Sequence, residues 1–152
     1  MKNTYIFGHK NPDTDTICSA LAYQIIKEKL GEETIAAKLG DINEETNYVL
    51  EYLNMEAPVT ITSVKDVNVI MVDHNEFSQS IDDIESGQII EVVDHHRVAN
   101  FKTESPLYMN VQPVGCTATI LYEIAISNNV EIDEELAVIL MSAIISDSLL
   151  FK

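Results

Sequence analysis

All four histidines of the chain stand close to aspartates, and each lies where an apolar segment ends. A single aspartate after a strand is most simply explained as a turn or a helix cap. Capping does not explain why every histidine lies at one of three such points, so the pattern predicts a shared metal site. The groups are His9 with Asp13 and Asp15, His74 with Asp73, and His95 and His96 with Asp94.

The types of these side chains indicate which ions the site would bind. Imidazoles mixed with carboxylates suit Mn²⁺, Co²⁺ or Fe²⁺ better than a structural zinc site, which would use thiolates. Cys18 and Cys116 have no CxxC spacing, and we expect them to be reduced, buried thiols. The donors are too many for one ion but fit two. Two divalent ions about 3.5–4 Å apart hydrolyse phosphate esters and anhydrides.

Asp147 adds an independent argument, because it continues an apolar helix face. Leu136, Leu140, Ala143 and Asp147 follow one face of the last predicted helix. An unpaired carboxylate pointing inward from that face would be very costly, and a metal ion would resolve the conflict. The alternative is that Asp147 lies beyond the helix end, in solvent.

Apolar runs and capping signals predict alternating strands and helices. We expect α/β architecture, with a mostly parallel sheet flanked by helices on both faces. In such a sheet the carboxyl ends of the strands line one crevice, where the histidines and aspartates would gather. The helix at 43–53 should pack through Tyr48, Val49 and Tyr52. The predicted strands are 4–8, 34–39, 67–72, 88–93 and 107–111, and the predicted helices are 15–30, 43–53, 78–85, 116–127 and 133–146.

Charge and length limit the partners and the number of domains. The chain has 152 residues, 25 of them acidic and nine basic, for a net charge of −16. This charge argues against nucleic acid or an anionic membrane as a partner, but permits a phosphate substrate that binds with cations. No apolar run approaches the roughly 20 residues of a membrane helix, and no signal peptide is evident, so we expect a cytoplasmic protein. One domain fits the length, and the apolar end, SDSLLFK, suggests a domain cut from a longer protein.

Other motifs point to no further chemistry. GxGxxG, GxxxxGK[ST] and GxSxG are absent. Cys116 opens a predicted helix and is best explained as a small buried residue, although the N–H groups of that helix N-terminus could receive a phosphate. Lys10 and Arg97 are the basic residues within the motifs, and solvation alone would explain either.

Five segments in chain order carry a family pattern: GHKNPDTDTICSA at 8–20, VDHNE at 72–76, VDHHR at 93–97, PVGCTATI at 113–120 and SAIISDSLLFK at 142–152. Together they resemble the N-terminal domain of the family II, manganese-dependent inorganic pyrophosphatases, within the DHH phosphoesterase superfamily. The resemblance implies that residues 1–152 form a DHH domain that stops before a second, smaller domain, which supplies basic side chains to the phosphates.

The resemblance also implies roles for individual residues. Asp73 would bridge two ions, and Asp73 and His96 would serve the reaction, with His96 near the substrate. Asp94 would orient a histidine and Asn75 would help hold the site, whereas His74 has no assigned role. The implied metal ligands are His9, Asp13 and Asp73 for one ion and Asp15, Asp73, His95 and Asp147 for the other.

The activity implied is hydrolysis of pyrophosphate to two phosphates, by attack of a hydroxide that bridges two Mn²⁺ or Co²⁺ ions, with Mg²⁺ accompanying the substrate. The resemblance further implies a homodimer formed through this domain. Without the second domain we expect weak or no turnover. Two alternatives stay open: another DHH phosphoesterase acting on short nucleotides or polyphosphate, and a non-catalytic metal-binding or dimerisation module.

Overall fold

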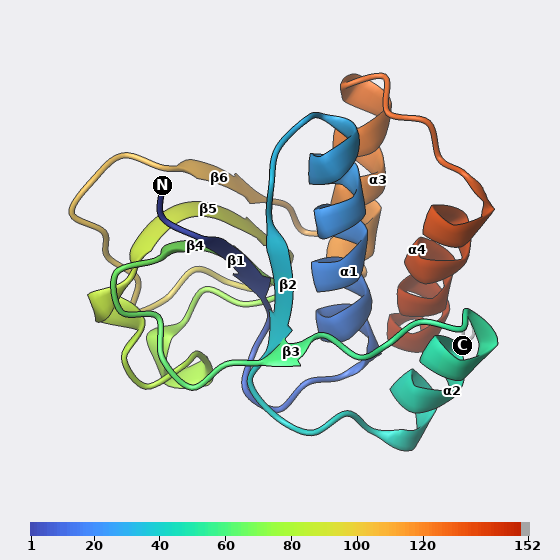
Figure 1. The fold of residues 1–152 in the computed structure, drawn as a ribbon, viewed down its shortest axis with the longest axis horizontal. Helices are drawn as coiled ribbons and strands as arrows, with labels where there is room; N and C mark the ends of the chain where they lie inside the picture. The colour runs from blue at the N-terminus through green and yellow to red at the C-terminus, as the bar shows by residue number, and fades with distance from the viewer. Residues whose placement is uncertain (150–152) are drawn as a thin grey trace.

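The chain folds around a six-stranded sheet with the strand order β3-β2-β1-β4-β5-β6, in which every neighbouring pair is parallel (Figure 1). The computed structural model describes residues 1–149, so the last three residues of the 142–152 motif lie outside the described residues. The predicted α/β class and parallel sheet are confirmed. The strands are β1 (Thr4–Phe7), β2 (Ile35–Lys38), β3 (Val59–Thr60), β4 (Asn68–Val72), β5 (Gln88–Asp94) and β6 (Tyr108–Val111).

The strand order creates a crevice between β1 and β4. Ile6 of β1 pairs with Ala36 of β2 on one side and with Ile70 of β4 on the other. From β1 the chain continues toward β3, and from β4 it continues toward β6 in the opposite direction. In parallel sheets, ligands bind at the carboxyl ends of the strands where the direction of winding reverses. His9 follows β1 and Asp73 follows β4, so both lie at this point.

Four α-helices lie together on one face of the sheet (Figure 1). Three of them begin at an acidic or amide side chain that accepts a hydrogen bond from a backbone N–H of the first turn: Asp13, Asn43 and Asp133. Within the described residues, no helix combines the length and the apolar character needed to cross a membrane. The helices are α1 (Thr14–Lys29), α2 (Glu44–Tyr52), α3 (Thr117–Ser127) and α4 (Glu134–Asp147).

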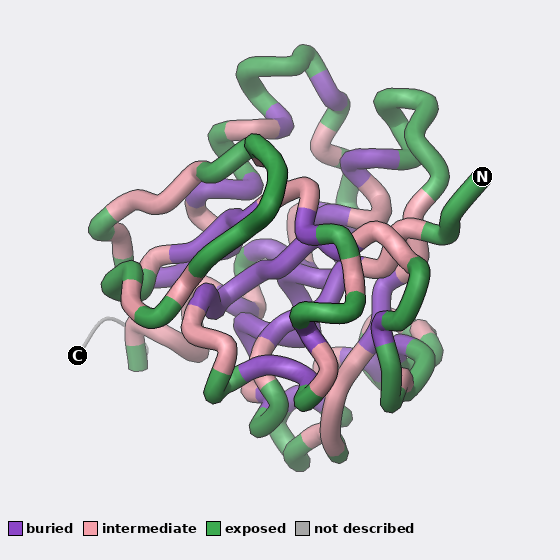
Figure 2. Tube along the Cα trace, turned by 90° about the vertical axis from the view of Figure 1, so that its left-hand side faces the viewer, coloured by how far each residue is buried: buried purple, intermediate pink, exposed green. Residues whose placement is uncertain are grey.

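The two faces of the sheet are covered differently. Figure 2 shows the buried stretches running through the middle of the molecule, with exposed loops around them. Because side chains alternate along a strand, Ile6 and Ile70 pack against α1, α3 and α4, whereas Phe7 and Met71 pack on the opposite face. That opposite face carries loops and two short 3₁₀-helices, so helices do flank both faces, but full α-helices cover only one.

The predicted helix at 78–85 is wrong. The segment forms two separate 3₁₀ turns, η1 (Phe77–Gln79) and η2 (Ile84–Ser86). Ser80, which ends η1, hydrogen-bonds His74, and the Asp83 carboxylate accepts from the backbone N–H of Val64. These side-chain hydrogen bonds compete with continuous helix, as serine and aspartate commonly do.

The predicted packing face of α2 is wrong at its two tyrosines, whereas Val49 packs against the core as predicted. Thr46 and Leu50 are buried, whereas Tyr48 and Tyr52 are 69% and 71% exposed. Thr46 and Leu50 are four residues apart, so they form one narrow stripe, and this stripe faces the core. The tyrosines lie on the solvent side of this short helix.

Candidate metal centre

Asp73 occupies the centre of the cluster and is almost fully buried. It follows β4 directly and has a φ of 59°, a left-handed conformation that aspartate adopts more readily than most residues. Its N–H donates to the carbonyl of Val93 at 3.0 Å. The hydroxyls of Thr16 and Thr117 donate to its carboxylate at 2.8 and 3.3 Å. The carboxylate is therefore held from α1 and from α3.

His9 and Asp13 form the first donor group with Asp73. The Nε2 atom of His9 lies 3.3 Å from Oδ2 of Asp73 and 3.6 Å from Oδ2 of Asp13. Asp13 uses its other oxygen, Oδ1, to cap α1 through the N–H of Thr16. One donor atom from each of the three side chains lies within 4.8 Å of the others, which is compatible with binding one ion.

A second donor group forms around His95, with Asp15, Asp73 and Asp147. Its Nε2 atom lies 3.1 Å from Asp73 Oδ1 and 3.7 Å from an oxygen each of Asp15 and Asp147. Its Nδ1 atom lies 3.0 Å from the carbonyl oxygen of Val114, which can only accept, so Nδ1 carries a hydrogen and Nε2 is directed at the carboxylates. The hydrogen bond to Asp73 raises the pKa of His95 to about 9. The carboxylates therefore favour positive charge at this point, as a proton or as a metal ion.

Asp15 is fully buried and binds the N-terminus of α3. Its oxygens accept from the backbone N–H groups of Thr117 at 2.9 Å and Ala118 at 3.2 Å, and from the hydroxyl of Ser19 at 2.9 Å. Burial, followed by the charge of Asp73, raises the pKa of Asp15 well above its ordinary value. The idea that this helix N-terminus receives a phosphate is therefore wrong, because these N–H groups already bind Asp15.

Asp147 is the last residue of α4 and faces the cluster, with its side chain 22% exposed. The apolar face that leads to it is buried through Leu136, Leu140 and Ala143, as the helical spacing predicts. Burial raises the pKa of Asp147, as expected for a carboxyl group drawn into a crowded acidic site. The alternative of a solvated Asp147 beyond the helix end is not what the structure shows.

Asp94 and Asn75 form a buried support beneath His96. The Oδ1 atom of Asp94 accepts from the N–H groups of His95 and His96 at 2.8 and 3.1 Å and lies 2.7 Å from Nδ1 of His96. The amide of Asn75 donates to the other oxygen of Asp94 at 2.7 Å. The hydrogen bond with Asp94 raises the pKa of His96, whose side chain is 51% exposed.

His74 lies apart from the donor groups. Its Nδ1 atom lies 2.9 Å from the carbonyl oxygen of Val72, and its Nε2 atom lies 3.0 Å from the hydroxyl of Ser80. Burial lowers the pKa of His74 to about 4, so the ring is neutral near pH 7. Both nitrogens are occupied by the fold, so His74 is not placed to bind an ion, although the sequence pattern grouped it with the other histidines.

Sequence reasoning did not place three further residues beside the cluster, although it singled out Cys116 as a small buried residue. Thr16 and Thr117 hold the central carboxylate through their hydroxyls, and Cys116 brings its sulfur within 4.8 Å of oxygens of Asp15 and Asp147. The sequence offered one signal for each: Thr16 directly follows Asp15, and Cys116 and Thr117 stand at the start of α3. Both cysteines are free and buried, as predicted.

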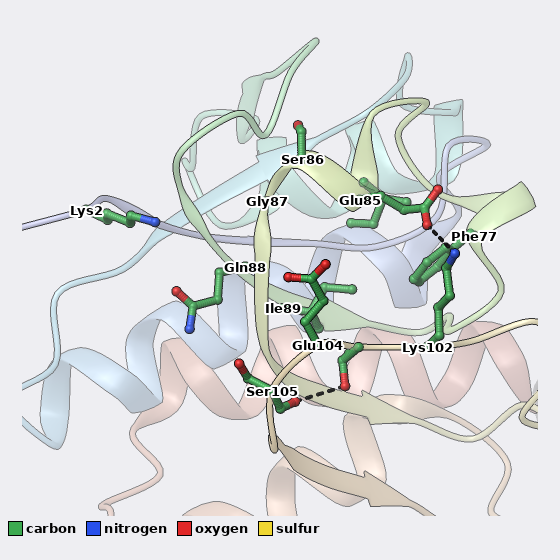
Figure 3. Close-up of a pocket in the computed structure, with 12 residues that line it drawn as sticks. Lys2, Phe77, Glu85, Ser86, Gly87, Gln88, Ile89, Lys102, Glu104 and Ser105 are labelled. Carbon is green, nitrogen blue, oxygen red and sulfur yellow. Dashed lines mark hydrogen bonds and ion pairs between the residues drawn. The ribbon is translucent and has the colours of Figure 1, made fainter.

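A cavity of about 510 Å³ opens beside the donor groups and is lined by His9, Asp73, His96 and Arg97, among others. A second cavity, of about 500 Å³, lies at 84–89 and 102–105 and includes the ion pair of Lys102 with Glu85 at 2.7 Å (Figure 3). Its described lining contains no histidine or aspartate. The cavity that borders the donor groups is therefore the functional candidate.

The donor set fits hard or borderline divalent cations. Carboxylate oxygens combined with imidazole nitrogens suit Mn²⁺ and its neighbours in the first transition row. Carboxylates gathered this closely repel one another, and bound cations would relieve that repulsion. The donors come from three strand ends and from the ends of two helices, so the fold itself assembles the set: His9, Asp13, Asp15, Asp73, His95 and Asp147.

Known proteins share the sequence pattern and the fold of this chain. The sequence model of the DHH family, N-terminal domain, matches residues 3–144. The manganese-dependent inorganic pyrophosphatase of Bacillus subtilis is 56% identical over 154 residues, which cover 100% of this chain and 50% of the relative. The probable manganese-dependent inorganic pyrophosphatase of Bacillus pumilus gives the same identity and coverage.

A solved structure from Methanococcus jannaschii, described as a "putative family II inorganic pyrophosphatase", superimposes with a TM-score of 0.87 at 42% identity. The superposition covers 97% of this chain and 49% of that one. The chain thus spans about half the length of the curated relatives it matches. With the family pattern matched over nearly all of its length, the chain belongs to the DHH family and corresponds to its N-terminal domain.

Proposed function

We propose that this domain forms the metal-binding half of an inorganic pyrophosphatase, which hydrolyses pyrophosphate to two phosphates. The observation that carries the proposal is the convergence of two donor groups on one shared carboxylate, Asp73. The names of the relatives supply the substrate and the metal, pyrophosphate and manganese.

Two divalent ions, Mn²⁺ or Co²⁺, would occupy the site, with Mg²⁺ accompanying the substrate. Such ions neutralise phosphate oxygens and make a water molecule acidic enough to supply hydroxide near neutral pH. The carboxylate of Asp73 lies between the two groups and is held by hydroxyls from α1 and α3, so it is suited to bridging. The proposed ligands are His9, Asp13 and Asp73 for one ion and Asp15, Asp73, His95 and Asp147 for the other.

His96 would contact the substrate directly. Asp94 accepts from Nδ1 of its ring, which leaves Nε2 available to hydrogen-bond a phosphate oxygen. The side chain is half exposed and lines the cavity that also contains His9 and Asp73. Asn75 supports this arrangement by holding Asp94.

The chain of residues 1–152 would bind metal but turn over pyrophosphate weakly or not at all. Phosphoryl transfer depends on positioning and on charge stabilisation around the phosphates. Among the described residues that line the cavity, Arg97 is the only basic one apart from the histidines, in a chain of net charge −16. We include in the proposal a single domain, a cytoplasmic location and a homodimer. The outer strand β6, with Tyr108 and Met109 exposed, is the support for the homodimer.

Metal binding by the chain tests the proposal. After dialysis against a chelator, titration with Mn²⁺ followed by calorimetry should give two bound ions for the wild type. Asp73→Ala should lose most of this binding, because it removes the bridging carboxylate. Asp82→Ala is the matched control, since Asp82 is fully exposed and outside the cluster. A wild-type chain that binds neither Mn²⁺ nor Co²⁺ would refute the site.

Substrate assays distinguish the alternatives. Phosphate release should be slow or absent with pyrophosphate, and absent with a dinucleotide or a long polyphosphate. Faster cleavage of a dinucleotide or of polyphosphate would favour another DHH phosphoesterase. Rapid turnover of pyrophosphate by residues 1–152 would contradict the proposed weakness of this chain. Light scattering on the same samples tests the homodimer.

A further inference from the structure

Arg97 is the only arginine of the chain, and it follows His96 directly. Together with His96, His9 and Asp73 it lines the cavity of about 510 Å³ beside the donor groups. Among the described lining residues it is the only lysine or arginine. This guanidinium is therefore the permanent positive charge that the described lining offers to an anion.

The backbone at Arg97 is held in place by a buried asparagine. The side-chain amide of Asn75 donates to the carbonyl of Arg97 at 2.8 Å and to Asp94 at 2.7 Å. The amide oxygen of Asn75 accepts from the N–H of Ala99 at 3.1 Å. The loop after β5 is thus pinned to the segment after β4, and the start of the Arg97 side chain has a fixed position at the cavity.

The guanidinium itself is exposed to solvent. The Arg97 side chain is 81% exposed, and its described partner is Glu76, whose Oε1 accepts from Nε at 3.2 Å. Glu76 lines the same cavity. An exposed ion pair contributes little, about 0–1 kcal/mol, so a phosphate at the cavity could displace Glu76. The planar guanidinium presents two parallel N–H groups that match a phosphate.

We propose that Arg97 binds one phosphate group of a diphosphate substrate in this cavity, and that Glu76 holds the guanidinium aside until the anion arrives. The inference rests on the proposed function, because the ions must first make the cavity receptive to an anion. It adds a substrate-binding residue from this domain to His96. A diphosphate in this cavity would meet the metal centre through one phosphate and Arg97 through the other.

The test measures binding of methylenediphosphonate, a diphosphate that cannot be hydrolysed, to the Mn²⁺-loaded chain by calorimetry. Arg97→Gln should bind it about tenfold more weakly, since a charge-assisted bond to phosphate is lost. Glu76→Gln should bind it about threefold more tightly, because the competing carboxylate is neutral. Lys102→Gln is the matched control, an exposed basic residue paired with Glu85 in the other cavity (Figure 3).

Reading the Mn²⁺ titration first separates the possible failures. If the wild type does not bind Mn²⁺, the proposed function and this inference both fail. If Mn²⁺ binds normally but the wild type does not bind the diphosphonate, or Arg97→Gln binds it as tightly as the wild type does, only the role of Arg97 is overturned. Unchanged diphosphonate affinity in Glu76→Gln would overturn the role of Glu76. A loss of diphosphonate affinity in Lys102→Gln as large as that in Arg97→Gln would show a general charge effect and not a contact made by Arg97.

Discussion

Replacing Gly8 with alanine should disturb the fold and the metal centre together. Gly8 follows β1 and lies against the first turn of α1. An added Cβ would lie 2.3 Å from Cγ2, 2.8 Å from Oγ1 and 2.9 Å from Cβ of Thr16. The backbone of Gly8 is not left-handed, so the penalty is steric. Thr16 donates to Asp73 at 2.8 Å, and the clash is therefore transmitted to the central carboxylate.

The size of the effect follows from these contacts. Ordinary contact would require Thr16 to move by roughly 1 Å in a tightly packed interior. Overpacking of this kind costs about 1–3 kcal/mol. Weakening a hydrogen bond to a charged acceptor adds about 1.5–3 kcal/mol. We therefore expect Gly8→Ala to lower the free energy of unfolding by about 3–5 kcal/mol.

Urea unfolding and Mn²⁺ titration measure the two consequences. Mn²⁺ affinity should fall about 10–100-fold, as it does when a residue that orients a metal ligand is lost. Adding Thr16→Ser to Gly8→Ala removes the closest atom and keeps the hydroxyl, so it should restore part of both quantities. Gly115→Ala is the matched control, since an added Cβ there meets nothing within 4 Å. A Gly8→Ala variant with wild-type unfolding and Mn²⁺ binding would refute the reasoning.

Three further predictions concern groups away from the cluster. Lys27→Ala removes the cation that lies 2.6 Å from the largely buried Glu91 and should cost about 3–5 kcal/mol in thermal unfolding. Lys27→Met with Glu91→Gln, which keeps an acceptor for the Tyr23 hydroxyl, should recover most of the loss. Burial opposes a charged Lys27, but Glu91 outweighs it and raises the pKa of Lys27, and burial raises the pKa of Tyr23. The folded state therefore holds both protons to a higher pH than the unfolded state does. The free energy of unfolding should therefore fall as the pH rises above about 10, and a flat profile in urea would contradict this. Gly40→Ala would bring a Cβ within 2.5 Å of the Lys10 carbonyl oxygen and should cost about 1–3 kcal/mol, so an unchanged urea midpoint would count against the packing described.

The central strands were predictable because they are buried on both faces. Val69, Ile70, Met71 and Val72 of β4 are all buried, so the strand is a continuous apolar run. The pattern gave no comparable signal for β3, which has two residues and leaves Val59 53% exposed. The pattern was also a poor guide at α2 and at 78–85. Helix docking decides which residues of α2 are buried, and local side-chain hydrogen bonds decide the structure of 78–85.

The acidic and histidine donors were predictable for a topological reason. Residues that follow parallel strands meet at one edge, so the ends of β1, β4 and β5 bring His9, Asp73 and His95 together. The contacts that hold these donors were not predictable, because they depend on how α3 docks against α1. The hydroxyl of Thr117 on Asp73 and the N–H of Thr117 on Asp15 arise only from that docking.

The contact between Asp15 and the first residues of α3 has a consequence for the protein before it acquires any cation. A helix N-terminus carries a partial positive charge of about half an elementary charge. Aimed at Asp15 through Thr117 and Ala118, this charge offsets part of the repulsion among the crowded acids. The helix thus acts as a built-in counterion, and any change that loosens α3, even far from the cavity, should also weaken the capture of ions.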